Sequence, residues 1–243
     1  NDLLKKHKNV KIECDKRLLK IFERSFKKDI FFPFGYYSSS KNKLESFDKI
    51  LYAGSLTKYY RKKEQDFNIN PYLKTIKELD SNMKLKLEKF KNTKKIGISW
   101  KSIINIYGNL KSLKISDFER LFSKNRTFIN LQYGNTDKEI KYLEDRGKNI
   151  FSFKNIDLFN DFESLLSILK NLDIFVTVSN STAHFAGALG IPTILICPKK
   201  SATYYYWDYD NGKTPWYKSV SIVKFKTSTE YTMNLVNDLI NKV

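Results

Sequence analysis

The stretch from Asp173 to Pro198, DIFVTVSNSTAHFAGALGIPTILICP, constrains the fold of this chain more than any other. Ile174 to Val178 is an apolar, β-branched run, which is typical of a strand buried on both faces of a sheet. Four residues with hydroxyl or amide side chains follow, and such residues cap the free N–H groups of a helix start. The pattern then turns small and helical, ends at Gly190, and continues in a second buried strand, Thr193 to Cys197.

A helix that starts at the carboxyl end of a parallel strand is where open α/β sheets bind ligands, anions above all. The candidate ligand-binding residues of this turn are Ser179, Asn180, Ser181, Thr182 and His184. His184 falls in the first turn of the helix or just beyond it, facing either the crevice or the neighbouring strand. The residues alone leave two interpretations open, an anion site or a βαβ packing unit whose polar turn is only a cap.

The segment SNSTAHFAGALGIPTILICP, followed by TPWYKSVSIVKF, resembles the C-terminal half of the heptosyltransferase-like glycosyltransferases, glycosyltransferase family 9. The likeness extends roughly from Lys95 to Lys226 and looks strongest to the branch that is often fused to tetratricopeptide repeats. In that family a turn of this type, followed by Ala-Gly-Ala-Leu-Gly, binds the nucleotide-sugar donor. Ser179 stands where the family usually has Asp, which removes a carboxylate from the expected donor site.

A long polar loop, Lys101 to Leu113, follows the predicted strand Lys95 to Trp100 and carries the basic residues Lys101 and Lys111. In the family a basic residue just before a Ser-Leu or Ser-Ile pair approaches the donor diphosphate, and Lys111 matches that position. A cation there would offset the charge that develops on the leaving group. Without the resemblance, Lys111 reads as a solvated surface lysine.

The next predicted strand, Thr127 to Leu131, ends at Gln132-Tyr133-Gly134, and the resemblance places this ending beside the donor base. An amide at the carboxyl end of a strand can pair with the edge of a base. Gln132 could equally cap the following helix, and the sequence does not decide between the two.

An aromatic segment follows Pro198. So many rings outside a regular element indicate a platform on which a sugar or base stacks, or a lid over the crevice. An RNA-binding surface would also interleave aromatic residues with lysines. The family has a Trp-rich loop and Pro-Trp-Tyr here, which favours the first interpretation. The residues are Tyr204, Tyr205, Tyr206, Trp207, Tyr209, Trp216 and Tyr217.

Composition limits the class of protein. In 243 residues, 41% hydrophobic and 15% aromatic content exclude a disordered chain, and no apolar run reaches the length of a membrane span. Cys14 and Cys197 lie in apolar stretches and read as reduced core thiols, which fits a cytoplasmic enzyme.

The chain is strongly basic, with 44 Lys and Arg against 26 Asp and Glu and a formal net charge of +18. Such a charge suits phosphorylated small molecules, polyanions or the anionic inner face of a membrane, where the protein would bind peripherally. Because the lysines are scattered through nearly every segment, a generally basic surface without a specific partner explains the charge equally well.

The first part of the chain alternates between strand and helix. The expected elements are a strand at Val10 to Cys14, a helix at Lys16 to Phe26, strands at Asp29 to Phe32 and Phe47 to Tyr52, and a helix at Ser55 to Arg61 capped by Ser55. This resembles the later part of the family's N-terminal domain. The opening strand and glycine loop, which in the family bind the acceptor and are thought to supply the general base, have no counterpart, so the catalytic base is unassigned. Asp2 and Asp15 read as helix-start residues.

From Lys95 onward strand and helix alternate about six times, which predicts a doubly wound, mostly parallel sheet. With the resemblance, we expect an α/β fold of the GT-B type, built from two Rossmann-like doubly wound domains of which the N-terminal one is truncated. Residues 1–92 would form the partial acceptor-side domain and connector, and residues 93–243 the nucleotide-sugar-binding domain.

The resemblance implies transfer of a sugar from a nucleotide-diphosphate donor to the hydroxyl of a glycan, lipid-linked or protein acceptor, with inversion. The two histidines and two cysteines lie far apart in sequence and no Asp-x-Asp is present, so we expect metal independence and no cofactor besides the donor. Two alternatives are a degenerate member that binds a nucleotide or glycan without turnover, and a basic, aromatic-rich nucleic-acid-binding module; we expect no specific nucleic acid.

Overall fold

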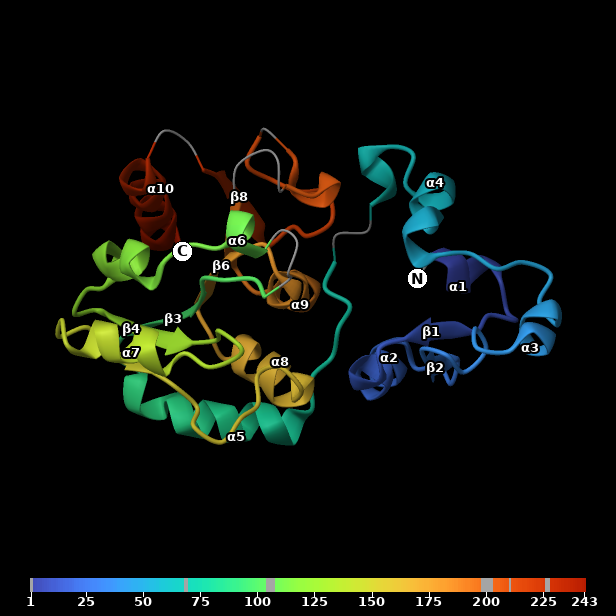
Figure 1. Cartoon of the computed structure of the whole chain (residues 1–243), viewed down its shortest axis with the longest axis horizontal. Helices are drawn as coiled ribbons and strands as arrows, with labels where there is room; N and C mark the ends of the chain where they lie inside the picture. Colours follow the sequence, from blue (N-terminus) through green and yellow to red (C-terminus); the bar gives the residue numbers. More distant parts are fainter. Residues whose placement is uncertain (1, 68–69, 104–107, 198–202, 210, 226–227) are drawn as a thin grey trace. The chain divides into compact units, whose positions relative to one another are not determined.

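The chain divides into two units, Asn1–Lys74 and Thr75–Val243, each of which contains a parallel sheet (Figure 1). The structure is a computed structural model and describes residues 2–67, 70–103, 108–197, 203–209, 211–225 and 228–243. Within these ranges no helix combines the length and the apolar character that crossing a membrane requires.

The first unit contains a two-stranded parallel sheet in which Ile12 pairs with Phe31. Helix α2 connects the two strands and buries Ile21, so the strand–helix–strand pattern predicted for residues 10–32 is confirmed. The elements are α1 (Asp2–Lys6), β1 (Ile12–Cys14), a 3₁₀ turn (Lys16–Leu18), α2 (Leu19–Phe26), β2 (Phe31–Pro33), α3 (Lys41–Glu45), 3₁₀ turns at Ala53–Leu56 and Glu64–Asp66, and α4 (Thr57–Tyr60).

The strand predicted at residues 47–52 is wrong, because this segment is irregular. Its apolar residues Ile50, Leu51 and Tyr52 are 60%, 40% and 89% exposed, and the sheet described in this unit holds only β1 and β2, so the run has no strand to pair with. The cap predicted at Ser55 is also wrong. The helical turn already begins at Ala53, which places Ser55 inside it.

The second unit is a six-stranded parallel sheet in the order β5-β4-β3-β6-β7-β8, which confirms the doubly wound α/β fold predicted from the sequence. Its strands are β3 (Lys94–Ser99), β4 (Arg126–Asn130), β5 (Ile150–Phe151), β6 (Ile174–Val178), β7 (Thr193–Cys197) and β8 (Val220–Lys224). Its helices are α5 (Lys77–Leu87), α6 (Gly108–Lys111), α7 (Asp137–Glu144), α8 (Phe162–Lys170), α9 (Ser181–Leu189) and α10 (Thr229–Lys242), with 3₁₀ turns at Glu88–Phe90, Ile115–Leu121 and Tyr205–Trp207.

Helix α5 packs against α8 in the second unit, where Asn171 Nδ2 donates to the Asp80 carbonyl at 3.0 Å. It spans Lys77–Leu87, within the stretch that the sequence assigns to the connector. Met83 and Leu87 anchor it because both are buried.

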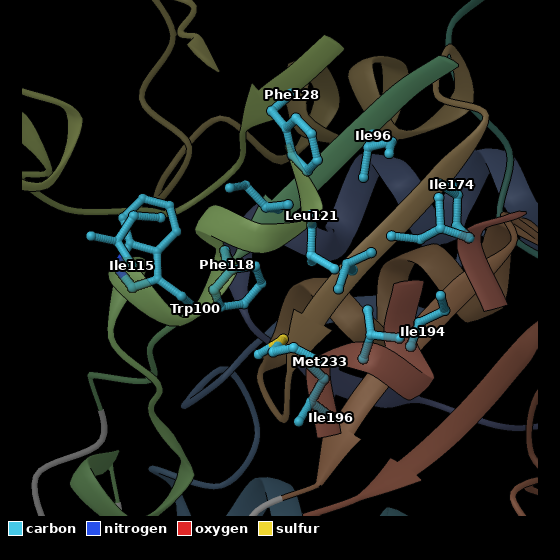
Figure 2. Packing of buried hydrophobic residues seen from close by; sticks show 14 of the residues in the cluster. Ile96, Trp100, Ile115, Phe118, Leu121, Phe128, Ile174, Ile194, Ile196 and Met233 are labelled. Atoms are coloured by element: carbon cyan, nitrogen blue, oxygen red, sulfur yellow. The ribbon is translucent and has the colours of Figure 1, made fainter. Parts of the chain in front are cut away.

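The sheet is covered on both faces. On one face, alternate strand residues such as Ile96, Ile174 and Ile194 pack against the 3₁₀ turn Ile115–Leu121 and helices α7 and α10 (Figure 2). At Gly97 a Cβ atom would point to the other face and would lie 2.5 Å from the Leu172 side chain. Helices α8 and α9 pack on each other on that face. The core is therefore two apolar layers around one sheet, and the polar residues gather at the sheet's ends. The two cysteines are buried and free, as the sequence predicted.

Candidate functional site

The winding of the sheet reverses between β3 and β6. From β3 the chain moves to β4 and β5 on one side, and from β6 it moves to β7 and β8 on the other. The loops that leave the carboxyl ends of β3 and β6 therefore diverge, and the crevice outside such a switch point is the position at which open α/β sheets bind their ligands. The residues proposed from the sequence follow β3, β4 and β6, so the fold brings them to this one edge (Figure 1).

Asn180 is the N-cap of α9 and fixes the floor of the crevice. Its Oδ1 accepts from the Ala183 N–H at 3.1 Å, and its Nδ2 donates to Ser99 Oγ at 3.0 Å and Thr177 Oγ1 at 3.2 Å. Because Ser99 ends β3 and Thr177 lies in β6, the Asn180 amide joins the two strands where the winding reverses. Its role in the structure is that of a cap and a bridge.

The first turn of α9 offers backbone donors to the crevice. The first N–H groups of a helix have no partner within it, and Asn180 satisfies only that of Ala183. The N–H groups of Ser181 and Thr182 are therefore the donors left for an anion, with the positive end of the helix dipole behind them. Ser181 is exposed, whereas Thr182 and Ser179 are 1% and 5% exposed. The buried Ser179 brings a hydroxyl and no charge to this turn.

Lys111 ends the short helix α6 and is a buried cation. The residue is only 2% exposed, and its Nζ lies 3.8 Å from the centre of the Tyr204 ring. No carboxylate forms an ion pair with it in the part of the chain that the structure describes. The sequence alone favoured a solvated Lys111, and the structure shows the opposite, with the Tyr204 ring lying over its ammonium.

Lys101 differs from Lys111 because its charge is already matched. Its ammonium donates to the Glu139 carboxylate of α7. Burial raises the pKa of Glu139, but the hydrogen bond and the charge of Lys101 outweigh it and hold that pKa below its usual value. Glu139 was missed from the sequence, where it reads only as an acidic residue in the first turn of a helix.

The amide of Gln132 is used within the protein. Its Oε1 accepts from the Ser99 hydroxyl at 3.0 Å and from the N–H groups of Trp100 and Lys101 at 2.9 and 2.8 Å, while its Nε2 donates to the Tyr133 carbonyl at 3.1 Å. Gln132 thus shapes the start of the loop after β3, a role that neither sequence interpretation included. The contact with a donor base stays a prediction.

His184 is enclosed by rings of the aromatic segment. It stacks on Trp207 with 4.8 Å between ring centroids, meets Tyr206 edge-on at 4.9 Å, and its Nδ1 lies 3.0 Å from the Tyr217 hydroxyl. Burial lowers the pKa of His184 to about 4, so the imidazole is neutral at pH 7 and adds no positive charge to the site.

The aromatic segment has a fixed part and a more open part. Trp207 and Tyr217 are 0% and 9% exposed against α9, whereas Tyr204 and Tyr205 are 37% and 62% exposed. Residues 199–202 and 210 of the predicted platform lie outside the described residues. Because the Tyr204 ring stacks on Tyr206 at 5.2 Å, a continuous series of ring contacts runs from Lys111 to the first turn of α9. Lys111 and the start of α9, which were predicted from separate motifs, are thereby connected.

Two cavities open at the same edge of the sheet. One, of about 620 Å³, is lined by the loop after β3 and includes Lys101, Ser112 and Glu139. The other, of about 1020 Å³, lies at the ends of β4 and β5 and includes Gln132 and Tyr133. Among the residues that the structure describes, no three potential metal-ligating side chains cluster.

No family model matches the chain. It is 31% identical over 146 residues to Protein FlbA of Caulobacter vibrioides, a match that covers 58% of this chain and 23% of FlbA. Among solved structures, the chain is similar to ADP-heptose lipopolysaccharide heptosyltransferase II of E. coli, with a TM-score of 0.47 and 12% identity over 75% of this chain and 57% of that one. It is also similar to a family 9 glycosyltransferase from Veillonella parvula, with a TM-score of 0.49 and 10% identity over 70% of this chain and 54% of that one.

The solved structures thus include heptosyltransferases and a member of glycosyltransferase family 9, the family that the sequence motif resembles. The chain spans about a quarter of the length of FlbA and little more than half of these two structures.

The packing of the aromatic segment on α9 depends on Gly187. A Cβ atom there would lie 2.5 Å from Tyr217 Cγ, and a ring held between Trp207 and His184 cannot easily move aside. We expect Gly187→Ala to lower the free energy of unfolding by about 1–3 kcal/mol, measured by urea denaturation. Gly54→Ala is the control, since a Cβ at Gly54 meets nothing within 4 Å. Equal effects of the two changes would contradict this account of the packing.

The neutral His184 makes stability depend on pH. Its pKa is about 4 in the folded chain against 6.5 for a free histidine, so the unfolded chain takes up a proton first as the pH falls. The stabilisation from a neutral His184 is therefore complete above pH 6.5 and is lost between pH 6.5 and 4, by up to about 3 kcal/mol.

Denaturation curves from pH 7 to 4.5 test this, comparing the wild type with His184→Gln. The variant should be less stable at pH 7 and lose less stability on acidification. His7→Gln is the control because His7 is exposed, and it should follow the wild type. A His184→Gln curve parallel to the wild-type curve would show that His184 is not the group responsible.

Proposed function

We propose that this chain carries the donor-binding part of a glycosyltransferase that uses a nucleotide-diphosphate sugar. The observation that supports this most is the buried Lys111 ammonium, which has no carboxylate partner among the described residues and stands at the carboxyl edge of the sheet. A cation withdrawn from water is costly unless an anion joins it, so this position favours a phosphorylated ligand.

The first turn of α9 supplies the second part of the anion site. The N–H groups of Ser181 and Thr182 would donate to the diphosphate, and Lys111 would balance its charge from the side of the loop after β3. His184 would act by position and not by charge, because its imidazole is neutral at pH 7. Two kinds of positive group would thus take the part that a metal ion plays in other enzymes.

The reaction proposed is an inverting displacement. The acceptor hydroxyl attacks the anomeric carbon on the face opposite the diphosphate, the bond from that carbon to the diphosphate oxygen breaks, and the electron pair leaves with the diphosphate. The proton of the hydroxyl passes to a general base, a role to which no described residue of this chain is assigned. Lys111 and the helix start act on the charge that builds up on the departing oxygen.

A second candidate function is binding of the nucleotide without turnover. It is favoured by Ser179, which is buried at the turn and carries a hydroxyl where the resembling family has a carboxylate.

Thermal denaturation with UDP, ADP, GDP and CMP, without metal, tests the donor site. A ligand that binds only the folded chain stabilises it by about 3 kcal/mol at a hundredfold excess over Kd. We expect one nucleotide to raise the melting midpoint, and Lys111→Ala to abolish the rise. Lys114→Ala is the matched control, because it removes the same charge three residues away from an exposed position. If both variants respond like the wild type, the Lys111 site is wrong.

Ser179→Asp separates an active enzyme from a degenerate one. If only the missing carboxylate limits activity, the substitution should create or increase hydrolysis of the donor sugar, measured as release of nucleoside diphosphate. Ser179→Asn is the control, since the Asn side chain has nearly the shape of Asp at the same buried position but carries no charge. Binding of the nucleotide with no turnover by either variant would favour the non-catalytic function.

A further inference from the structure

The ring of Tyr204 covers the one buried lysine of the proposed anion site. Lys111 Nζ lies 3.8 Å from the ring centre, close enough for the negative face of the ring to attract the ammonium. We propose that the Tyr204 ring occupies the position next to the Lys111 ammonium that a diphosphate would take. In this exchange, the diphosphate displaces the ring when it binds. This inference rests on the function proposed above and adds a residue that controls entry to its site.

The contacts of the aromatic segment allow this exchange. Tyr206 and Trp207 are held in place, because the Thr214 hydroxyl of the same segment donates to the Tyr206 carbonyl at 3.0 Å and Trp207 is fully buried beside His184 of α9. Tyr204 is 37% exposed, and among the described residues its ring stacks on Tyr206 and lies over the Lys111 ammonium. Its ring can therefore turn away from Lys111 while Tyr206 and Trp207 stay in place.

The exchange also makes the site selective for charge. A ring compensates an ammonium only weakly, whereas a phosphate oxygen pairs with it by a charge-assisted hydrogen bond. A neutral sugar or nucleoside offers Lys111 only uncharged acceptor oxygens, so it competes with the ring less well than a phosphate does. A ligand with two phosphate groups gains most, because it can contact Lys111 and the first turn of α9 together. Tyr204 would thus exclude uncharged compounds of similar shape.

Calorimetric titration with inorganic pyrophosphate tests the exchange on the whole chain. Removing the ring in Tyr204→Ala frees Lys111 from its competitor, so we expect pyrophosphate affinity to rise about twofold to thirtyfold, the range that follows from the strength of a cation–π contact. Tyr204→Phe keeps the ring and should bind like the wild type. Tyr205→Ala is the second control, since Tyr205 contacts Tyr206 and Trp216 but does not cover Lys111.

The outcomes separate this inference from the proposed function. If Lys111→Ala abolishes pyrophosphate binding and Tyr204→Ala leaves it unchanged or weaker, the exchange is wrong and the anion site stands. If Lys111→Ala has no effect on pyrophosphate binding, either in the wild type or in Tyr204→Ala, the exchange and the anion site are both wrong. If Tyr204→Ala binds pyrophosphate detectably and the wild type does not, the exchange is supported. Should Tyr204→Ala show a lowered melting midpoint, Tyr204→Leu fills more of the same space without a ring and carries the same test.

Discussion

The pairing of β3 with β6 is the constraint from which the arrangement of the candidate site follows. These two strands are neighbours in the sheet although the chain passes through β4, β5 and the helices α6, α7 and α8 between them. Their pairing sets Ser99 and Thr177 within reach of one amide, that of Asn180, which in turn caps α9. On its other side β3 pairs with β4, and this pairing brings Gln132 against the end of β3. A polar network of satisfied hydrogen bonds therefore fixes the floor of the crevice, and the groups left over are those that face a ligand.

Among the described residues of the loops after β3 and β6, two kinds of positive group are left to bind an anion. One is the pair of N–H groups at the start of α9, and the other is the Lys111 ammonium. Lys101, which the sequence treats as equivalent to Lys111, is matched by Glu139, and His184 is neutral because burial lowers its pKa to about 4. The electrostatics of the proposed site thus reduce to one buried charge and one helix dipole, joined by the rings of Tyr204 and Tyr206.

Much of the second unit could be predicted from the sequence because its strands are buried on both faces. Ile174–Val178 and Thr193–Cys197 have the bounds that their apolar runs predicted, since burial leaves no other conformation for such residues next to a polar turn. The run at residues 47–52 is similarly apolar, yet it is irregular and Ile50, Leu51 and Tyr52 are exposed, since the sheet described in its unit pairs only β1 with β2. An apolar pattern shows that a segment can be a strand, and only a neighbouring strand makes it one.

The sequence predicted separate parts of the site but not the contacts between them. The helix start after β6 and the lysine after β3 were both found, because capping residues and basic loops have local signals. The burial of Lys111 had none, since it depends on Tyr204, which lies far along the chain, in the segment after β7. The same holds for Glu139 and for the bonds of Gln132, which involve residues from separate loops.

The burial of Lys111 also divides the positive charge of the protein into two populations that respond differently to ionic strength. Most of the 44 Lys and Arg that give the net charge of +18 are scattered along the chain, and attraction of anions to a charged surface is screened over about 8 Å at physiological ionic strength. A buried charge such as Lys111 is screened much less. Loose attraction of anions to the surface should therefore fade as salt rises, while a phosphate held at Lys111 remains. In a basic protein of this kind, selectivity for one anion over the many that surround it would come from burial and not from the amount of charge.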